Sequence, residues 1–94
     1  MPQLDIAHIR EQGQDMIIAP LDGGFHHKSR AHQTAAIAEI QGAARSAGLG
    51  GTVVAIWEDP SGRTRFIAPR PWQSFFRNVS VAWVLQNINR TLSW

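Results

Sequence analysis

The chain has 94 residues, of which 44% are hydrophobic and 17% charged, and its formal net charge at pH 7 is +2. This length fits a single domain over residues 1–94 with one modest core, and the composition excludes a disordered tail. No apolar run approaches the roughly 18–20 residues of a membrane span, and the absence of cysteine excludes disulfides and thiolate chemistry. Because the first residues show no signal-peptide pattern, we expect a cytoplasmic protein without a membrane partner.

The N-terminal part of the chain is expected to contain one strand. Residues 4–12 are compatible with a short helix that Asp5 caps and Gly13 ends, or with an irregular arm. The compact apolar run over residues 15–19 predicts a buried strand, which a proline ends. A loop with two adjacent glycines follows over residues 22–28.

A long helix is predicted over residues 29–47. Small apolar side chains recur there at intervals of three and four residues: Ala36, Ile37, Ile40, Ala43, Ala44 and Ala47. Ser29 has the side chain of an N-cap, and Gly48 is placed to end the helix in the left-handed conformation.

A β-hairpin is predicted over residues 52–68. Its first strand, residues 52–57, is rich in β-branched and aromatic residues. The sequence Asp-Pro-Ser-Gly at 59–62 fits a type I turn, and the return strand covers residues 63–68.

A four-residue turn determines the register that we expect in this hairpin. It places Glu58 opposite Arg63, and Ile56 opposite Arg65. One set of side chains then points toward the helices: Val53, Ala55, Trp57, Phe66 and Ala68. Glu58, Arg63 and Arg65 lie on the other, open face of the sheet.

The C-terminal region is predicted to be helical. Pro71 opens one helical turn through residue 76. A helix over residues 79–92 has an apolar stripe on one face: Val81, Val84, Leu85, Ile88 and Leu92. We therefore expect an α+β two-layer sandwich, a three-stranded mixed sheet with both main helices packed on one face. The element order is β-α-β-β-α, preceded by a short N-terminal helix if residues 4–12 are helical.

Positive charge is concentrated in the C-terminal third. Residues 1–59 contain four basic and seven acidic side chains, whereas residues 60–94 contain five arginines and no carboxylate. Arginines beside flat apolar side chains suit single-stranded nucleic acid, because the cations pair with phosphates and the rings stack on bases. The nucleic-acid-binding residues that we predict are Arg63, Arg65, Arg70, Trp72 and Arg77. The alternative is ordinary solvation of the arginines, with the aromatic side chains in the core.

Aromatic side chains support a second hypothesis, a protein interface or a homodimer. Trp72, Phe75 and Phe76 have the spacing i, i+3 and i+4, so one helical turn brings them together. If the small core does not bury all of these rings, the remaining apolar patch is typical of a protein contact. Trp94 belongs to this predicted interface unless its ring docks on the body of the domain.

The loop before the long helix supports a third hypothesis, an anion or small-ligand site. The predicted residues are Gly24, His26, His27, Lys28 and Arg30. Glycines that lead from a strand to a helix N-terminus offer unpaired backbone N–H groups to phosphate or carboxylate. A metal site built from Asp22, His27 and His32 matches no standard spacing. Acid–base catalysis by a histidine of this loop lacks a nucleophile at a recognisable spacing.

These patterns favour a small intracellular binding domain over an enzyme, and they assign no catalytic residue, metal or cofactor. Nucleic acid is the first predicted partner, through the basic C-terminal third. A protein partner or a second copy of the chain, bound at the aromatic cluster, is the alternative. A small ligand at residues 23–32 is the third hypothesis.

Overall fold

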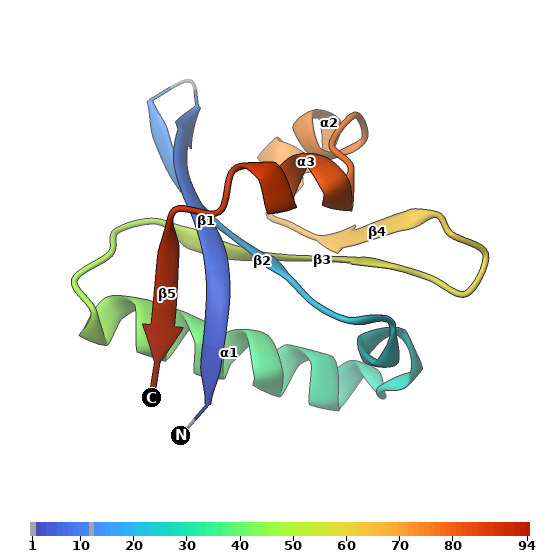
Figure 1. Cartoon of the computed structure of the whole chain (residues 1–94), viewed down its shortest axis with the longest axis horizontal. Coiled ribbons are helices and arrows are strands. Elements are labelled where there is room, and N and C mark those ends of the chain that lie inside the picture. The colour runs from blue at the N-terminus through green and yellow to red at the C-terminus, as the bar shows by residue number, and fades with distance from the viewer. Residues whose placement is uncertain (1, 12) are drawn as a thin grey trace.

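The computed structural model describes residues 2–11 and 13–94 and shows a five-stranded sheet between two helical layers (Figure 1). The strands are β1 (Gln3–Glu11), β2 (Gln14–Pro20), β3 (Thr52–Glu58), β4 (Thr64–Ile67) and β5 (Arg90–Ser93). The α-helices are α1 (Arg30–Ser46), α2 (Gln73–Phe76) and α3 (Val81–Gln86), and the 3-10 helices are η1 (Gly23–His27) and η2 (Arg70–Trp72). The strand order is β4-β3-β2-β1-β5, in which β2 and β3 are parallel and the other neighbours are antiparallel.

The predicted long helix is confirmed as α1, together with both of its ends. Ser29 Oγ accepts a hydrogen bond from the His32 N–H at 3.2 Å, as an N-cap does. Gly48 has φ +79°, and its N–H and that of Leu49 donate to carbonyls of the last turn at 3.0 and 2.9 Å. This pair of bonds is a Schellman motif, which requires the positive φ that glycine permits. Neither α1 nor any other helix in the described residues is long and apolar enough to cross a membrane.

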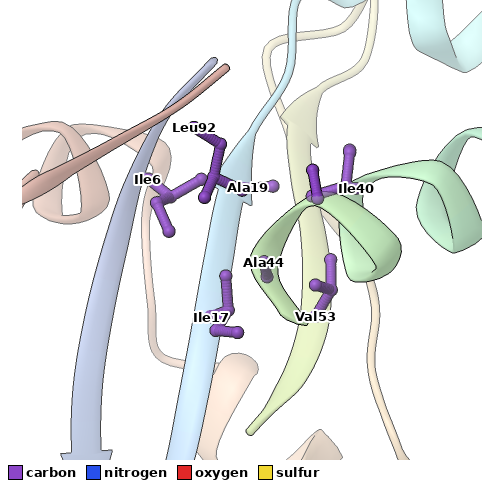
Figure 2. Packing of buried hydrophobic residues seen from close by; sticks show 8 residues of the cluster. Ile6, Ile17, Ala19, Ile40, Ala44, Val53 and Leu92 are labelled. Atoms are coloured by element: carbon purple, nitrogen blue, oxygen red, sulfur yellow. The ribbon is translucent and has the colours of Figure 1, made fainter. Parts of the chain in front are cut away.

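The helices lie on opposite faces of the sheet, so the predicted two-layer sandwich is wrong. α1 covers one face over a core that Figure 2 shows from close by: Ile6, Ile17, Ala19, Ile40, Ala43, Ala44, Val53 and Leu92. α2 and α3 cover the other face, over a second core: Ala7, Met16, Ile18, Val54, Ile56, Phe76 and Val84. Residues 53–57 are all buried, and such an uninterrupted apolar run is typical of a strand covered on both faces.

The sheet has five strands rather than the three that we predicted. Residues 3–11 form β1, neither a helix nor an irregular arm, because they pair antiparallel with both β2 and β5. The side chains of β1 alternate between the two cores, with Ile6 toward α1 and Ala7 toward α2 and α3. Because both faces of β1 are partly covered, its sequence lacks the clean alternation of polar and apolar residues that marks a half-exposed strand.

The predicted helix over residues 79–92 is wrong beyond residue 86. α3 ends there, and residues 90–93 form the edge strand β5, which pairs with β1. Asn89 holds this part of the chain on β1. Its side chain accepts a hydrogen bond from the His8 N–H at 2.8 Å and donates one to the His8 carbonyl at 2.9 Å. These bonds to the β1 backbone replace a further helical turn.

The β3–β4 hairpin is confirmed, but its register is shifted by one residue. The Gly62 N–H donates to the Asp59 carbonyl at 2.9 Å, which closes the predicted type I turn. Gly62 has φ +84°, and the Asp59 N–H donates to the Arg63 carbonyl at 2.9 Å, so a bulge follows the turn. Arg65 therefore lies opposite Trp57 instead of its predicted neighbour. A shift of one residue moves every β4 side chain to the other face.

This shift removes the predicted open face of the sheet with Glu58, Arg63 and Arg65. Arg65 lies on the α1 side, across from Trp57. Phe66 lies on the opposite side, where it packs against the core beneath α2 and α3. The face that we expected to be open is therefore the face that these two short helices cover.

Candidate functional site

Residues 70–88, here called the α2–α3 layer, carry a hollow in the protein surface. Its volume is about 300 Å³, and its lining residues are Phe75, Asn78, Val79 and Trp83. Phe75, Val79 and Trp83 are half-buried, so their side chains both complete the core and reach the surface. The hollow is therefore mostly apolar, with one side-chain amide.

Aromatic packing holds the rings that line the hollow. The Phe75 ring meets the Phe76 ring edge-on, with centroids 5.1 Å apart, and meets the Trp83 ring at 6.4 Å. Phe76 is 1% exposed and lies 5.9 Å from the ring of Phe66 on β4. Phe76 therefore ties the α2–α3 layer to the sheet and supports the lining rings from below.

Two side chains fix the short helix that carries Trp83. Ser80 is the N-cap of α3, and its Oγ accepts a hydrogen bond from the Trp83 N–H at 3.0 Å. Asn87, just after the helix, donates from its side-chain amide to the Trp83 carbonyl at 2.7 Å. Because a helix of 6 residues has little stability alone, these bonds and the core beneath it position the indole.

The α2–α3 layer contains arginines but no carboxylate of its own. Arg70 and Arg77 are exposed, and Arg77 immediately precedes Asn78 of the hollow. Trp72 is half-buried and packs against the same core. Three of the five predicted nucleic-acid residues, Arg70, Trp72 and Arg77, therefore belong to this layer.

The other two predicted nucleic-acid residues lie on the β3–β4 hairpin. Arg63 is exposed after the turn. Arg65 lies on the α1 side of β4, where its Nε donates to Asp59 Oδ2 at 2.8 Å. The register thus directs Arg65 away from the face that carries the hollow.

Asp59 is buried, and its carboxylate is fully hydrogen-bonded. It accepts bonds from the Ser61 hydroxyl at 2.5 Å, from Arg65 Nε, and from the N–H groups of Ser61 and Arg63. The Ser61 hydroxyl and the Arg65 guanidinium hold the pKa of Asp59 well below its usual range, against the opposite effect of burial. The sequence indicated only the role of Asp59 in the turn, because the pairing of Asp59 with Arg65 depends on the bulged register.

The loop predicted to bind an anion is folded against the α1 side of the sheet. The Gly24 N–H, one of the predicted binding groups, donates to Asp22 Oδ1 at 2.9 Å. Phe25 is buried, and its ring meets that of Trp57 at 4.8 Å. The Trp57 indole N–H donates to His26 Nδ1 at 3.3 Å. The remaining predicted residues are exposed: His27, Lys28 and Arg30.

The predicted protein-interface residues are divided between the two layers. Phe76 is buried and offers no surface, whereas Trp72 and Phe75 are half-buried in the α2–α3 layer. Trp94 lies on the α1 side, where its indole N–H donates to Glu39 at 2.5 Å and its ring packs against the core. The fold adds three lining residues that sequence analysis did not single out: Asn78, Val79 and Trp83.

No protein-family model, no curated protein and no solved structure matches the chain. Within residues 2–11 and 13–94, no three histidine, aspartate or glutamate side chains gather as ligands for a metal ion. The hollow of the α2–α3 layer is the leading candidate site, because it combines a concave shape, an aromatic lining and adjacent positive charge.

Proposed function

We propose that the α2–α3 layer binds single-stranded nucleic acid, with a base in the hollow and phosphates on Arg70 and Arg77. The observation that carries this proposal is the hollow itself, which two half-buried rings line in a part of the chain without carboxylates. Stacking on an aromatic side chain contributes about 1–3 kcal/mol per base and tolerates any base sequence. Contacts between arginine and phosphate add affinity that declines as salt rises.

Each group around the hollow has a chemical role in this proposal. The rings of Phe75 and Trp83 offer apolar surface to the face of a base. The side-chain amide of Asn78 offers both a donor and an acceptor to the edge of that base. Arg77 is exposed and adjacent to Asn78 in the chain, so its guanidinium is available to a neighbouring phosphate. Trp72, which packs in the same layer, extends the aromatic surface.

The two arginines of the hairpin have a smaller part in this function. Arg63 is exposed and extends the positive surface for a longer strand of nucleic acid. Arg65 faces the α1 side and is paired with Asp59. We therefore assign the phosphate contacts near the hollow to Arg70 and Arg77.

An NMR titration of the isotope-labelled chain with a mixed-sequence single-stranded oligonucleotide tests the proposal. At a low salt concentration of about 50 mM, we expect shifts of the Trp83 indole signal and of the amides of residues 75–79. These shifts should fade as salt rises. The Trp94 indole lies on the α1 side and is the internal control, so its signal should not move.

Arg77→Gln and Arg45→Gln form a matched pair of variants, because both arginines are exposed and Arg45 lies on α1. Arg77→Gln should weaken oligonucleotide binding and reduce the salt slope by about one, since one phosphate contact is lost. Arg45→Gln should change neither quantity. The absence of any shift at low salt, or equal effects of the two variants, would contradict the proposal.

One observation favours a second candidate function, docking of a protein segment or of a second copy of the chain. Three of the four residues that line the hollow are apolar, as in the centre of a protein interface. Association through such a surface persists at high salt, unlike binding of nucleic acid. Sedimentation velocity at low and high salt separates the two functions, and a strictly monomeric chain would exclude the homodimer.

A further inference from the structure

Trp57 joins two segments that lie far apart in the sequence. It is paired directly with Arg65 of β4, on the α1 side of the sheet. Its indole N–H donates to Nδ1 of His26, in η1, at 3.3 Å. Arg65 and His26 therefore both neighbour one indole ring, at the end of the molecule where η1 approaches β3 (Figure 1).

The Arg65 guanidinium is held in place from one side. Its Nε donates to Asp59 Oδ2 at 2.8 Å, and the Ser61 hydroxyl and the Arg63 N–H fix Asp59 in turn. Among the described residues, no acceptor bonds the two terminal nitrogens of the guanidinium, and the side chain is 53% exposed. Arg65 thus presents a fork of N–H donors whose orientation is set before any ligand binds.

His26 presents a second donor beside the same indole. Because its Nδ1 accepts the indole proton, the neutral imidazole carries its own proton on Nε2. In the described part of the chain, no buried side-chain nitrogen or oxygen lacks a hydrogen-bond partner. The half-buried His26 has no such partner for Nε2, so this N–H reaches the solvent.

The charges near these two donors favour an anion. Lys28 immediately follows η1, Arg30 is the first residue of α1, and both are exposed. Two nearby carboxylates accept hydrogen bonds from the chain itself, and a third, that of Glu58, follows Trp57 in β3 and so points to the opposite face of the sheet. Asp22 accepts a backbone N–H at 2.9 Å, and Asp59 accepts the Nε–H of Arg65. On the α1 side, the groups without a partner are therefore mainly donors and cations.

We propose that Arg65 and His26, which both neighbour the buried Trp57 indole, bind a phosphate-type oxyanion. A guanidinium donates two parallel hydrogen bonds to two oxygens of one phosphate, and the imidazole N–H donates to another oxygen. The site lies at the carboxyl ends of the parallel strands β2 and β3, the end of the sheet where ligands commonly bind. It is on the α1 side, so it goes beyond the function proposed for the hollow and does not depend on it.

Inorganic phosphate is the probe, added to the isotope-labelled full chain at constant ionic strength with chloride as the reference. We expect a saturable shift of the Trp57 indole N–H signal and of the amides of residues 26–28, because the indole proton is bonded to His26. Arg65→Gln should weaken phosphate binding by about tenfold or more, as the loss of charge-assisted hydrogen bonds does. The control Arg45→Gln, an exposed arginine in the last turn of α1, should leave the affinity unchanged.

Two further variants keep the proposal testable, because Arg65→Gln also removes a partner of Asp59. Arg65→Lys retains a positive charge near Asp59 but loses the two-pronged guanidinium. Phosphate affinity should therefore fall, while the NMR spectrum of the variant still shows the wild-type fold. His26→Phe removes the imidazole donor and should weaken phosphate binding as well. The absence of a saturable shift at the Trp57 indole, or equal affinities of wild type and these variants, overturns the proposal.

A second titration, with the oligonucleotide that tests the hollow, separates a small phosphate compound from nucleic-acid phosphates. The indole signals of Trp57 and Trp83 are followed together. If inorganic phosphate moves only Trp57 and the oligonucleotide moves only Trp83, the ligand of Arg65 and His26 is a small phosphate compound. If both probes move Trp57, the site also takes nucleic-acid phosphates. A shift of Trp57 by the oligonucleotide without any response to inorganic phosphate overturns the small-anion site and leaves the hollow unaffected.

Discussion

The two helical layers cover one sheet in different ways. On one face α1, with 17 residues, buries Ile40, Ala43 and Ala44 and has side-chain and glycine caps at its ends. On the other face α2 and α3, with 4 and 6 residues, cover the sheet mainly with larger side chains such as Phe76. Small residues let one helix lie close to the sheet along its length, whereas large rings on short helices leave space between them.

This difference explains why the hollow lies in the α2–α3 layer. Helices as short as α2 and α3 are marginal alone, so aromatic packing must hold them on the sheet. Two short helices do not cover all of these rings, and Phe75 and Trp83 stay half-buried. The same side chains therefore stabilise the layer and provide its exposed apolar surface.

Phe76→Ala is the most severe test of whether rings hold the α2–α3 layer. Phe76 is 1% exposed and packs between the rings of Phe66 and Phe75. Its truncation should lower the free energy of unfolding by about 3–5 kcal/mol, which urea unfolding measures. Phe75→Ala removes a half-buried ring, so it should cost less stability and should weaken oligonucleotide binding. Equal losses of stability in the two variants would contradict this division.

Backbone conformation rather than ring packing decides the effects of two glycines, one inside α1 and one just after its C-terminal cap. Gly48 has φ +79°, so Gly48→Ala should cost about 1–2 kcal/mol of stability. Gly42 lies inside α1 with open space at its Cβ position, so Gly42→Ala should add about 0.5–1 kcal/mol. Thermal unfolding of both variants checks the opposite signs, and a loss in both would refute this account.

A pH-dependent effect is expected in the hairpin that leads from the sheet into the α2–α3 layer. Bonds from the Ser61 hydroxyl and Arg65 lower the pKa of Asp59 in the folded protein. The ionised carboxylate therefore stabilises the fold fully above about pH 4, the usual range in an unfolded chain. That contribution is lost as the pH falls through the lower folded-state pKa. Asp59→Asn should be less stable than wild type at neutral pH, and the difference should narrow in acid.

Thermal unfolding of wild type and Asp59→Asn across the acid range measures this narrowing. Ser61→Ala is the companion variant, because it removes the hydroxyl that contributes most to the lowered pKa. An NMR titration should then find the pKa of Asp59 closer to its usual range. A difference between wild type and Asp59→Asn that stays constant in acid would show that the carboxylate charge does not stabilise the hairpin.

Elements defined by neighbouring residues could be predicted from the sequence. The spacing of small apolar side chains, with Ser29 before it and Gly48 after it, was enough to locate α1. The apolar runs of β2 and β3 and the type I turn at residues 59–62 were also visible. Each of these signals reports a local preference, namely a cap, a steric restriction on the backbone or a periodic burial.

The candidate sites depended on contacts that no local pattern contains. Asn89 bonds to His8 across 81 residues, and this contact belongs to the sheet edge that replaced the end of the predicted last helix. Trp83 does not belong to the apolar stripe of the predicted helix over residues 79–92. This position outside the stripe was the only local sign that its ring could line a surface.

Local sequence patterns thus predict α1, the two buried strands and the hairpin turn, and the composition shows the excess of positive charge in the C-terminal third. Contacts in the folded chain decide which face each helix covers, that residues 90–93 form a strand, and on which face Arg65 lies. The physical reason is that a single bulged residue, Gly62, reverses the faces of a whole strand. Strand pairing and burial are settled between residues remote in sequence, whose combined packing outweighs the local helical pattern near the C-terminus.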